Sequence, residues 1–235
     1  MSKNCIQYEL DDIHRLLLKY ADEKYRSFSA RLLPPHTPLM GVRLPILRQI
    51  AKQGIRQKGI LFLKQLTDDS FEEKMLSGFV IGYVSLPISD KIPYIENYLN
   101  KVDNWSLCDS FCATFCLSDS DKKTLLPFLK RCLNNDKEYV VRFGVVMLLM
   151  YYITETDIDM CLKLFERISH QGYYVQMAVA WAVSICYIQY SRQTLLFLQK
   201  NTLNKYVQNK AIQKIRESVC VSQDKKDFVL QYKKH

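Results

Sequence analysis

The feature that most limits the folds open to this chain is a regular spacing of long apolar segments. Each has the apolar pattern of a buried helix, and successive segments begin 34, 34, 35 and 31 residues apart, near Ser70, Asn104, Glu138, Tyr173 and Asn204. Shorter and more polar helical segments lie between them, over residues 91–102, 122–133, 158–168 and 192–198. A period of this length, built from helix pairs, is typical of a helical solenoid, because one pair cannot bury its own apolar face.

The rest of the sequence agrees with an all-helical fold. No segment shows the alternation of a strand, and seven Gly and seven Pro in 235 residues are few for a sandwich or barrel. The consensus residues of tetratricopeptide repeats are not visible. We therefore predict an all-α superhelix of HEAT-like repeats, forming one domain over residues 1–235, with its long helices along a concave face.

The first 66 residues are predicted to lead into these repeats. One helix is expected from Asp11–Asp12 to about Leu33, where two prolines end it. Residues 36–41 read as a loop, and Arg43-Leu44-Pro45 opens the next helix, with the proline tolerated in its first turn. A short helix over residues 60–66 follows.

Charge and cysteine usage narrow the class of protein. The chain carries 33 Lys and Arg against 24 Asp and Glu, a net charge of +9, which fits a polyanionic partner such as nucleic acid. Eight cysteines without disulfide or zinc spacing read as reduced and buried, and we expect no metal. The sequence contains no glycine-rich phosphate-binding loop, so we expect no cofactor. The longest apolar run, residues 143–153, is too short to span a membrane, so a soluble, cytoplasmic protein is expected.

The segment at residues 104–116 carries the first candidate site. Trp105 and Asp109 are four residues apart, so a helix places them on one face. A carboxylate costs several kcal/mol to bury without a partner, so Asp109 needs either a partner or a groove. The alternative is a core tryptophan beside a salt-bridged aspartate, because aromatic residues at helical spacing are mostly core.

Two further candidates lie on the next two long segments. Arg142 is the only cation in residues 139–153, so it must reach solvent, a carboxylate or a ligand anion. A structural ion pair, with Asp109 for example, is the alternative. Trp181 lies in a segment that is apolar all round, where a core tryptophan is equally natural.

Together these residues resemble the AlkD-type DNA glycosylases, a HEAT-repeat family that removes alkylated purines. The resemblance starts at the segment PLMGVRLP, residues 38–45, and continues through Trp105, Asp109, Arg142 and Trp181, in the order of the family's active-site residues. Asn104 and Phe143 stand where the founding type has a second tryptophan and a second arginine. The sequence is closer to a sister branch of predicted DNA alkylation repair enzymes.

The resemblance implies a monofunctional glycosylase that acts on N3- and N7-alkylated purines in duplex DNA without base flipping. Asp109 would stabilise the deoxyribose cation and position water, Trp105 and Trp181 would contact the cationic lesion, and Arg142 would hold a phosphate. DNA would be bound mainly through its backbone, with Arg43, Arg48, Lys205, Lys210 and Lys214 as the candidate contacts. The expected protein is a cofactor-free monomer of the bacterial cytoplasm, associated with the nucleoid.

Two other functions remain open from the sequence. A non-catalytic HEAT-repeat protein could bind bent, branched or damaged DNA through a basic face, without releasing a base. A protein-binding scaffold would use the tryptophans as anchors or as core. The fold alone does not decide among these functions.

Overall fold

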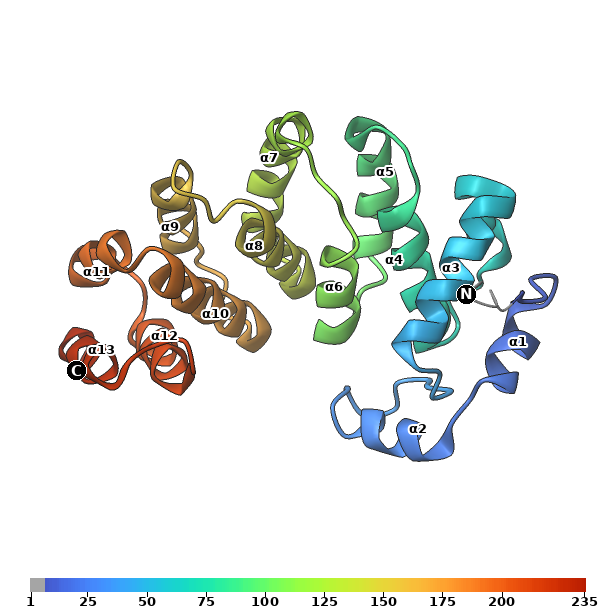
Figure 1. Ribbon diagram of the computed structural model, residues 1–235, viewed down its shortest axis with the longest axis horizontal. Coiled ribbons are helices and arrows are strands. Elements are labelled where there is room, and N and C mark those ends of the chain that lie inside the picture. Colours follow the sequence, from blue (N-terminus) through green and yellow to red (C-terminus); the bar gives the residue numbers. More distant parts are fainter. Residues whose placement is uncertain (1–6) are drawn as a thin grey trace, which may run out of the picture. The chain divides into compact units, whose positions relative to one another are not determined.

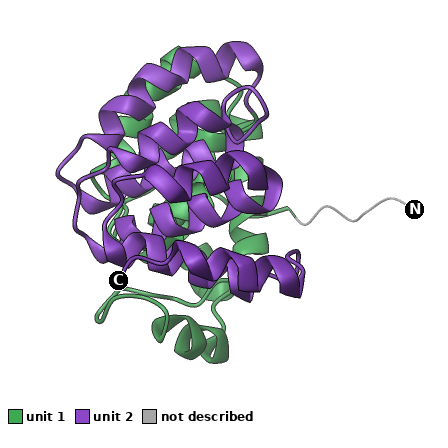
Figure 2. Cartoon of the chain, turned by 90° about the vertical axis from the view of Figure 1, so that its left-hand side faces the viewer, with its two compact units in different colours: residues 1–116 green, residues 117–235 purple. Residues whose placement is uncertain are grey.

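The computed structural model describes residues 7–235, which contain α-helices, short 3-10 helices and connecting loops but no strand (Figure 1). The all-helical prediction is therefore confirmed for the described chain. The chain divides into two compact units, residues 1–116 and 117–235 (Figure 2). One domain over residues 1–235 and a concave DNA-binding face stay predictions.

Unit 1 is built around α4, which is buried along almost its whole length. Met75, Leu76 and Phe79 have no exposed surface, and α4 packs against α3, α5, α6 and the 3-10 helix η1. The elements of this unit are α1 Ile13–Lys19, α2 Glu23–Ala30, α3 Leu44–Lys58, η1 Gly59–Gln65, α4 Phe71–Tyr83, α5 Ile88–Leu99 and α6 Trp105–Cys112.

Unit 2 has two rows of helices. Within it, α10 packs against both α8 and α12, and α7, α9 and α11 lie along the other side of this row (Figure 1). The elements are α7 Asp119–Leu133, α8 Glu138–Tyr151, α9 Ile158–Glu166, α10 Tyr173–Gln189, α11 Ser191–Lys200, α12 Lys205–Glu217, α13 Gln223–Phe228 and the 3-10 helix η2 Val229–Tyr232. Helix pairs stacked in two rows are the arrangement that the repeat spacing predicts, although α7, expected to be one of the shorter helices, is 15 residues long and α8 is 14.

The predicted starts of the long helices are confirmed. Ser70, Asn104 and Asn204 cap α4, α6 and α12, each accepting a hydrogen bond from a backbone N–H in the first turn. Glu138 and Tyr173 are the first residues of α8 and α10. The four helices expected between them are also present, but the predicted difference in length fails at α6, whose 8 residues are fewer than the 12 of α5 and the 15 of α7.

The single helix expected from Asp11–Asp12 to Leu33 is wrong, because the chain forms α1 and α2 with a break between them. Asp22 causes the break. Its side chain accepts a hydrogen bond from the N–H of Tyr25 and so caps α2, and its own N–H donates to the carbonyl of Gly41. A loop distant in sequence therefore takes the backbone bond that would have continued α1.

The loop before α3 is held by a buried carboxylate on α4. Glu72 has no exposed surface and accepts hydrogen bonds from the N–H groups of Met40, Gly41 and Val42 at 3.0, 2.7 and 3.1 Å. Gly41 has a φ of +94°, and a Cβ there would lie 2.6 Å from the carbonyl oxygen of Asp22. This loop conformation therefore requires both Glu72 and a glycine.

Among the described cysteines, Cys108, Cys112, Cys132, Cys161 and Cys186 are buried and form no disulfide, as predicted. Cys116 and Cys220 are exposed, which corrects the expectation of buried cysteines, since they follow the ends of α6 and α12, where the chain leaves the core. Cys5 lies outside the described residues. None of the described helices is long and apolar enough to cross a membrane.

Candidate functional site

The face of α6 that carries Trp105 and Asp109 is partly exposed, whereas its opposite face is core. Leu107, Cys108 and Phe111 are almost fully buried, and both Trp105 and Asp109 keep part of their surface open to solvent. Trp105 is therefore not a fully buried core residue. Because the two residues are one helical turn apart, an indole and a carboxylate lie next to each other at an accessible surface.

Asn104 fixes the start of α6 and so the position of Trp105. The Asn104 side chain is fully buried, accepts a hydrogen bond from the N–H of Leu107 at 3.0 Å and donates one to Asp103 at 2.8 Å. An asparagine N-cap satisfies an N–H that the helix itself cannot. Trp105 is consequently held as the first residue of the helix.

The indole of Trp105 is also fixed by a contact with the segment after α2. Its Nε1 donates a hydrogen bond of 3.0 Å to the carbonyl oxygen of Leu32, 73 residues earlier in the chain. With the ring's only N–H bound to the protein, the indole can offer a ligand its π faces but no hydrogen bond.

Arg142 is nearly buried, with 6% of its surface exposed, and joins α8 to α10. Its Nη1 donates a hydrogen bond of 2.7 Å to the carbonyl oxygen of Tyr174. Glu138, one turn earlier on α8, accepts a hydrogen bond of 2.6 Å from the N–H of the same tyrosine. Arg142 therefore has a structural role, which the sequence left open, and one of its partners is a backbone carbonyl.

Trp181 lies on a partly exposed stripe of α10. Met177, one turn before it, and Ile185, one turn after it, are partly exposed as well, whereas Ala178, Ala182 and other residues of the facing stripe are buried. A stripe of large apolar and aromatic side chains at helical spacing thus reaches the surface of unit 2. Trp181 is accessible, although its sequence surroundings suggested a core position.

The four predicted residues form two pairs. The structure brings Trp105 and Asp109 together on α6 of unit 1, and it brings Arg142 and Trp181 onto the packed helices α8 and α10 of unit 2. The described residues contain no group of three or more His, Cys, Asp and Glu side chains that could hold a metal ion.

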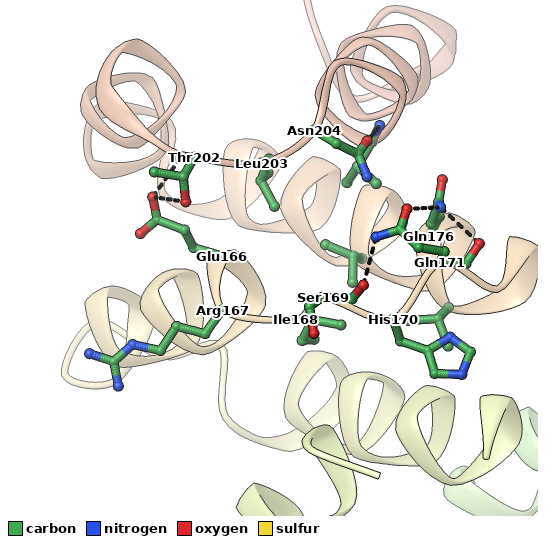
Figure 3. A pocket seen from close by; sticks show the side chains of 13 residues that line it. Glu166, Arg167, Ile168, Ser169, His170, Gln171, Gln176, Thr202, Leu203 and Asn204 are labelled. Carbon is green, nitrogen blue, oxygen red and sulfur yellow. Dashed lines mark hydrogen bonds between the residues drawn. The ribbon is translucent and has the colours of Figure 1, made fainter. Parts of the chain in front are cut away.

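A separate pocket of about 220 Å³ lies between the end of α9, the start of α10 and the loop before α12 (Figure 3). Glu166 accepts hydrogen bonds from the N–H and hydroxyl of Thr202, and Gln171 donates to the carbonyl of Ser169. The first contact joins the end of α9 to the loop before α12, and the second lies within the loop before α10. None of the four predicted site residues lines this pocket.

The sequence model of the DNA alkylation repair enzyme family matches residues 13–215. The chain belongs to this family. No curated protein matches it. A member of a DNA repair family has DNA as its partner, and the matched region includes α6, α8 and α10 with all four predicted residues.

Two of the predicted DNA contacts of this DNA alkylation repair protein lie on α3 and just before it. Arg43 is exposed and forms an ion pair of 2.8 Å with Asp22, and its guanidinium lies 4.9 Å from the ring centroid of Tyr25. Arg48 lies 5.4 Å from the ring centroid of Phe79, and its buried Nε has no hydrogen-bond partner among the described residues. The side chain of Arg43 is exposed to solvent, whereas Arg48 is partly buried.

The other three predicted contacts lie on α12. Lys205 is exposed, and Lys210 and Lys214 are half-buried. Lys210 donates a hydrogen bond of 2.8 Å to Gln213 and lies 5.9 Å from the ring centroid of Tyr206. Their ammonium groups belong to a helix that also carries Arg216, a residue that the sequence analysis did not select.

Glu72 and Glu138 are two carboxylates that hold the backbone near the predicted sites, and neither was predicted from the sequence. Both are acidic residues in the first turn of an apolar helix, which reads as ordinary charge complementarity with the helix dipole. Their partners, Gly41 and Tyr174, are 31 and 36 residues away in sequence. Only the folded chain brings each pair together.

Proposed function

We propose that this protein is a monofunctional DNA glycosylase that hydrolyses the N-glycosidic bond of N3- or N7-alkylated purines in duplex DNA. The observation that carries the proposal is the accessible pair of Trp105 and Asp109 on α6, in a chain that belongs to a DNA alkylation repair family. Accessible tryptophans and a carboxylate suit a substrate whose leaving group carries a positive charge.

The chemistry requires few protein groups. The bond between C1′ and the base nitrogen breaks, and the positively charged base leaves with the electron pair as a neutral molecule, so no general acid is needed. The Asp109 carboxylate stabilises the positive charge that develops on the deoxyribose and accepts a proton from the water that attacks C1′. This single-carboxylate scheme contrasts with the two-carboxylate mechanism of glycosidases.

The tryptophans supply binding to the cation. The Trp105 indole, whose N–H is bound to Leu32, offers its faces to the cationic lesion or the sugar, and each such contact contributes about 0.5–2 kcal/mol. The partly exposed Trp181 has the same role on α10. Contact of this kind at an accessible face supports action without base flipping, which most enzymes that act on bases require.

Arg142 contributes mainly by position. Because it is 6% exposed and bound to Tyr174, its guanidinium holds the start of α10, the helix of Trp181, and presents only a small surface to a phosphate. A charged donor that the protein already orients adds directional binding of a phosphate oxygen beside the lesion. Its contribution is thus both structural and electrostatic.

The proposal is tested by base release from a duplex that carries one 7-methylguanine. We expect release by the wild type well above spontaneous depurination, and a decrease of about 100-fold or more for Asp109→Asn, with DNA binding retained. Asp69→Asn is the matched control, since it removes an exposed carboxylate from the same unit and should leave release unchanged. Wild-type release at the spontaneous rate, together with tight DNA binding, would instead establish the non-catalytic DNA-binding function.

A further inference from the structure

The C-terminal part of unit 2 forms an open groove of about 620 Å³ along α12. Its walls come from α12 and from a single residue of the last segment of the chain. The lining residues are Lys205, Tyr206, Asn209, Lys210, Gln213, Arg216 and Lys233. We call this the α12 groove.

Hydrogen bonds hold the last segment against α12. Asn209 pairs with Lys234 through both backbone groups: its Nδ2 donates to the carbonyl at 2.9 Å, and its Oδ1 accepts from the N–H at 2.9 Å. The Lys234 ammonium also donates to the carbonyl of Asn201 at 3.1 Å. The backbone on both sides of Lys233 is therefore fixed, because Gln208 binds the carbonyl of Tyr232.

The groove is strongly and one-sidedly charged. Four of its seven lining residues are cations, namely Lys205, Lys210, Arg216 and Lys233, and none is acidic. The chain places the fourth cation among the other three by binding a distant segment, although like charges repel. The ring of Tyr206, 44% exposed, adds an apolar surface beside them.

We propose that the α12 groove binds the sugar–phosphate backbone of duplex DNA, with Arg216 and Lys233 as phosphate contacts. The proposal relies on DNA as the partner but not on base excision. Both residues lie beyond residue 215, where the family match ends. Lys205 and Arg216 are about 16 Å apart along the helix axis, a length that matches about five phosphates of one DNA strand.

The principal test compares two double variants that each remove two positive charges. Arg216→Gln with Lys233→Gln changes the groove, and Lys123→Gln with Lys130→Gln changes α7, in the other row of unit 2. The dissociation constant for an undamaged duplex is measured between 50 and 200 mM salt. Each lost phosphate contact should lower the slope of log affinity against log salt by about 0.9, so the wild type should lose about tenfold more affinity over this range than the groove variant.

The α7 variant should keep the slope of the wild type, since its charges act only at long range. A groove variant that behaves like the α7 variant would overturn the proposal. So would an equal loss of binding to vesicles of anionic phospholipid, because the groove would then be a general polyanion surface. Urea unfolding of each variant establishes that differences in affinity come from folded protein.

Asn209→Ala tests the placement of Lys233 without changing the charge. Loss of the two bonds to Lys234 loosens the segment, which Gln208 and the Lys234 ammonium still bind at other points, so the salt slope should fall part of the way toward that of Lys233→Gln alone. An unchanged slope would contradict the role of these two bonds in placing Lys233. Base release by the wild type distinguishes failure of this proposal from failure of the proposed function. If the protein releases the base but the groove variant keeps the wild-type slope, the glycosylase proposal holds and the groove proposal fails. If the groove variant lowers the slope but the wild type releases no base, the groove proposal holds and the glycosylase proposal fails.

Discussion

Arg142 Nη1 lies 2.7 Å from the carbonyl oxygen of Tyr174, so a nearly buried guanidinium of α8 holds the first turn of α10. Glu138 accepts a hydrogen bond from the N–H of the same tyrosine. Both backbone groups of one residue are thus bound by side chains one turn apart on the neighbouring helix. Residues proposed to act on DNA and residues that fix the fold therefore meet at α8.

The first prediction concerns the carboxylate of this pair. Glu138→Ala should lower the free energy of unfolding by about 1–3 kcal/mol, because the N–H of Tyr174 loses a charged acceptor at a helix N-terminus. Glu138→Gln keeps an acceptor and should cost less. Urea denaturation measures both, with the exposed Glu155→Ala as control. Equal stability of Glu138→Ala and wild type would show that this bond is not important.

The second prediction separates the two roles of Arg142. Arg142→Gln should lower the free energy of unfolding by about 1.5–3 kcal/mol, since the bond to Tyr174 loses its charge. If the guanidinium also contacts a phosphate, the salt slope of DNA binding falls by about 0.9 in the same variant. Stability loss without a change in slope would assign Arg142 a purely structural role.

The third prediction concerns the indole N–H of Trp105. Trp105→Phe removes the bond to the carbonyl of Leu32, a loss of about 0.5–1.5 kcal/mol, and loosens the segment after α2. Trypsin should therefore cleave after the exposed Arg31 faster in this variant. Trp181→Phe lies in unit 2 and serves as the control. An unchanged cleavage rate in Trp105→Phe would contradict the role of the bond.

A fourth prediction tests the loop before α3. Gly41→Ala combines a positive φ with a Cβ that would lie 2.6 Å from the Asp22 carbonyl, whereas Gly59→Ala has a positive φ but an open environment. The strained conformation costs about 1–2 kcal/mol in both variants. Gly41→Ala should lose about 1–3 kcal/mol more, because a neighbour must move. Both variants are compared by thermal or urea unfolding. Equal losses of stability in Gly41→Ala and Gly59→Ala would show that there is no such clash.

A fifth prediction follows from the buried thiols. Burial raises the pKa of Cys161 from 9.0 to about 12, and its thiol donates to the carbonyl of Tyr152. Above pH 9 the unfolded chain releases this proton and the folded chain keeps it, so stability falls as pH rises from 9 toward 12. The free energy of unfolding of Cys161→Ala should therefore decrease less steeply over this pH range than that of the wild type, by up to about 1.4 kcal/mol per pH unit.

Alkylation at pH 8 independently tests whether the Cys161 thiol is buried. The exposed Cys116 and Cys220 should react with iodoacetamide in the folded protein, as identified by peptide mass mapping. Cys161 should react only after unfolding. Rapid reaction of Cys161 in the folded protein would contradict its burial.

Much of the fold could be predicted from the sequence because its signals are local. The capping residues Ser70, Asn104 and Asn204 lie at the starts of their helices, and apolar periodicity marks the elements between them. The break between α1 and α2 was not predictable in this way. Asp22 caps α2 through the N–H of Tyr25, but its own N–H also donates to the carbonyl of Gly41, and no local pattern records that second contact.

The candidate site shows the same division. The order of Trp105, Asp109, Arg142 and Trp181 on alternate helices is visible in the sequence, as is the family to which the chain belongs. The sequence left open whether the tryptophans are core, what Arg142 binds, and which residues join Lys210 in a basic groove. Tertiary structure decided these points, because burial and hydrogen-bond partners depend on segments such as residues 32, 174 and 233–234 that only folding brings into contact.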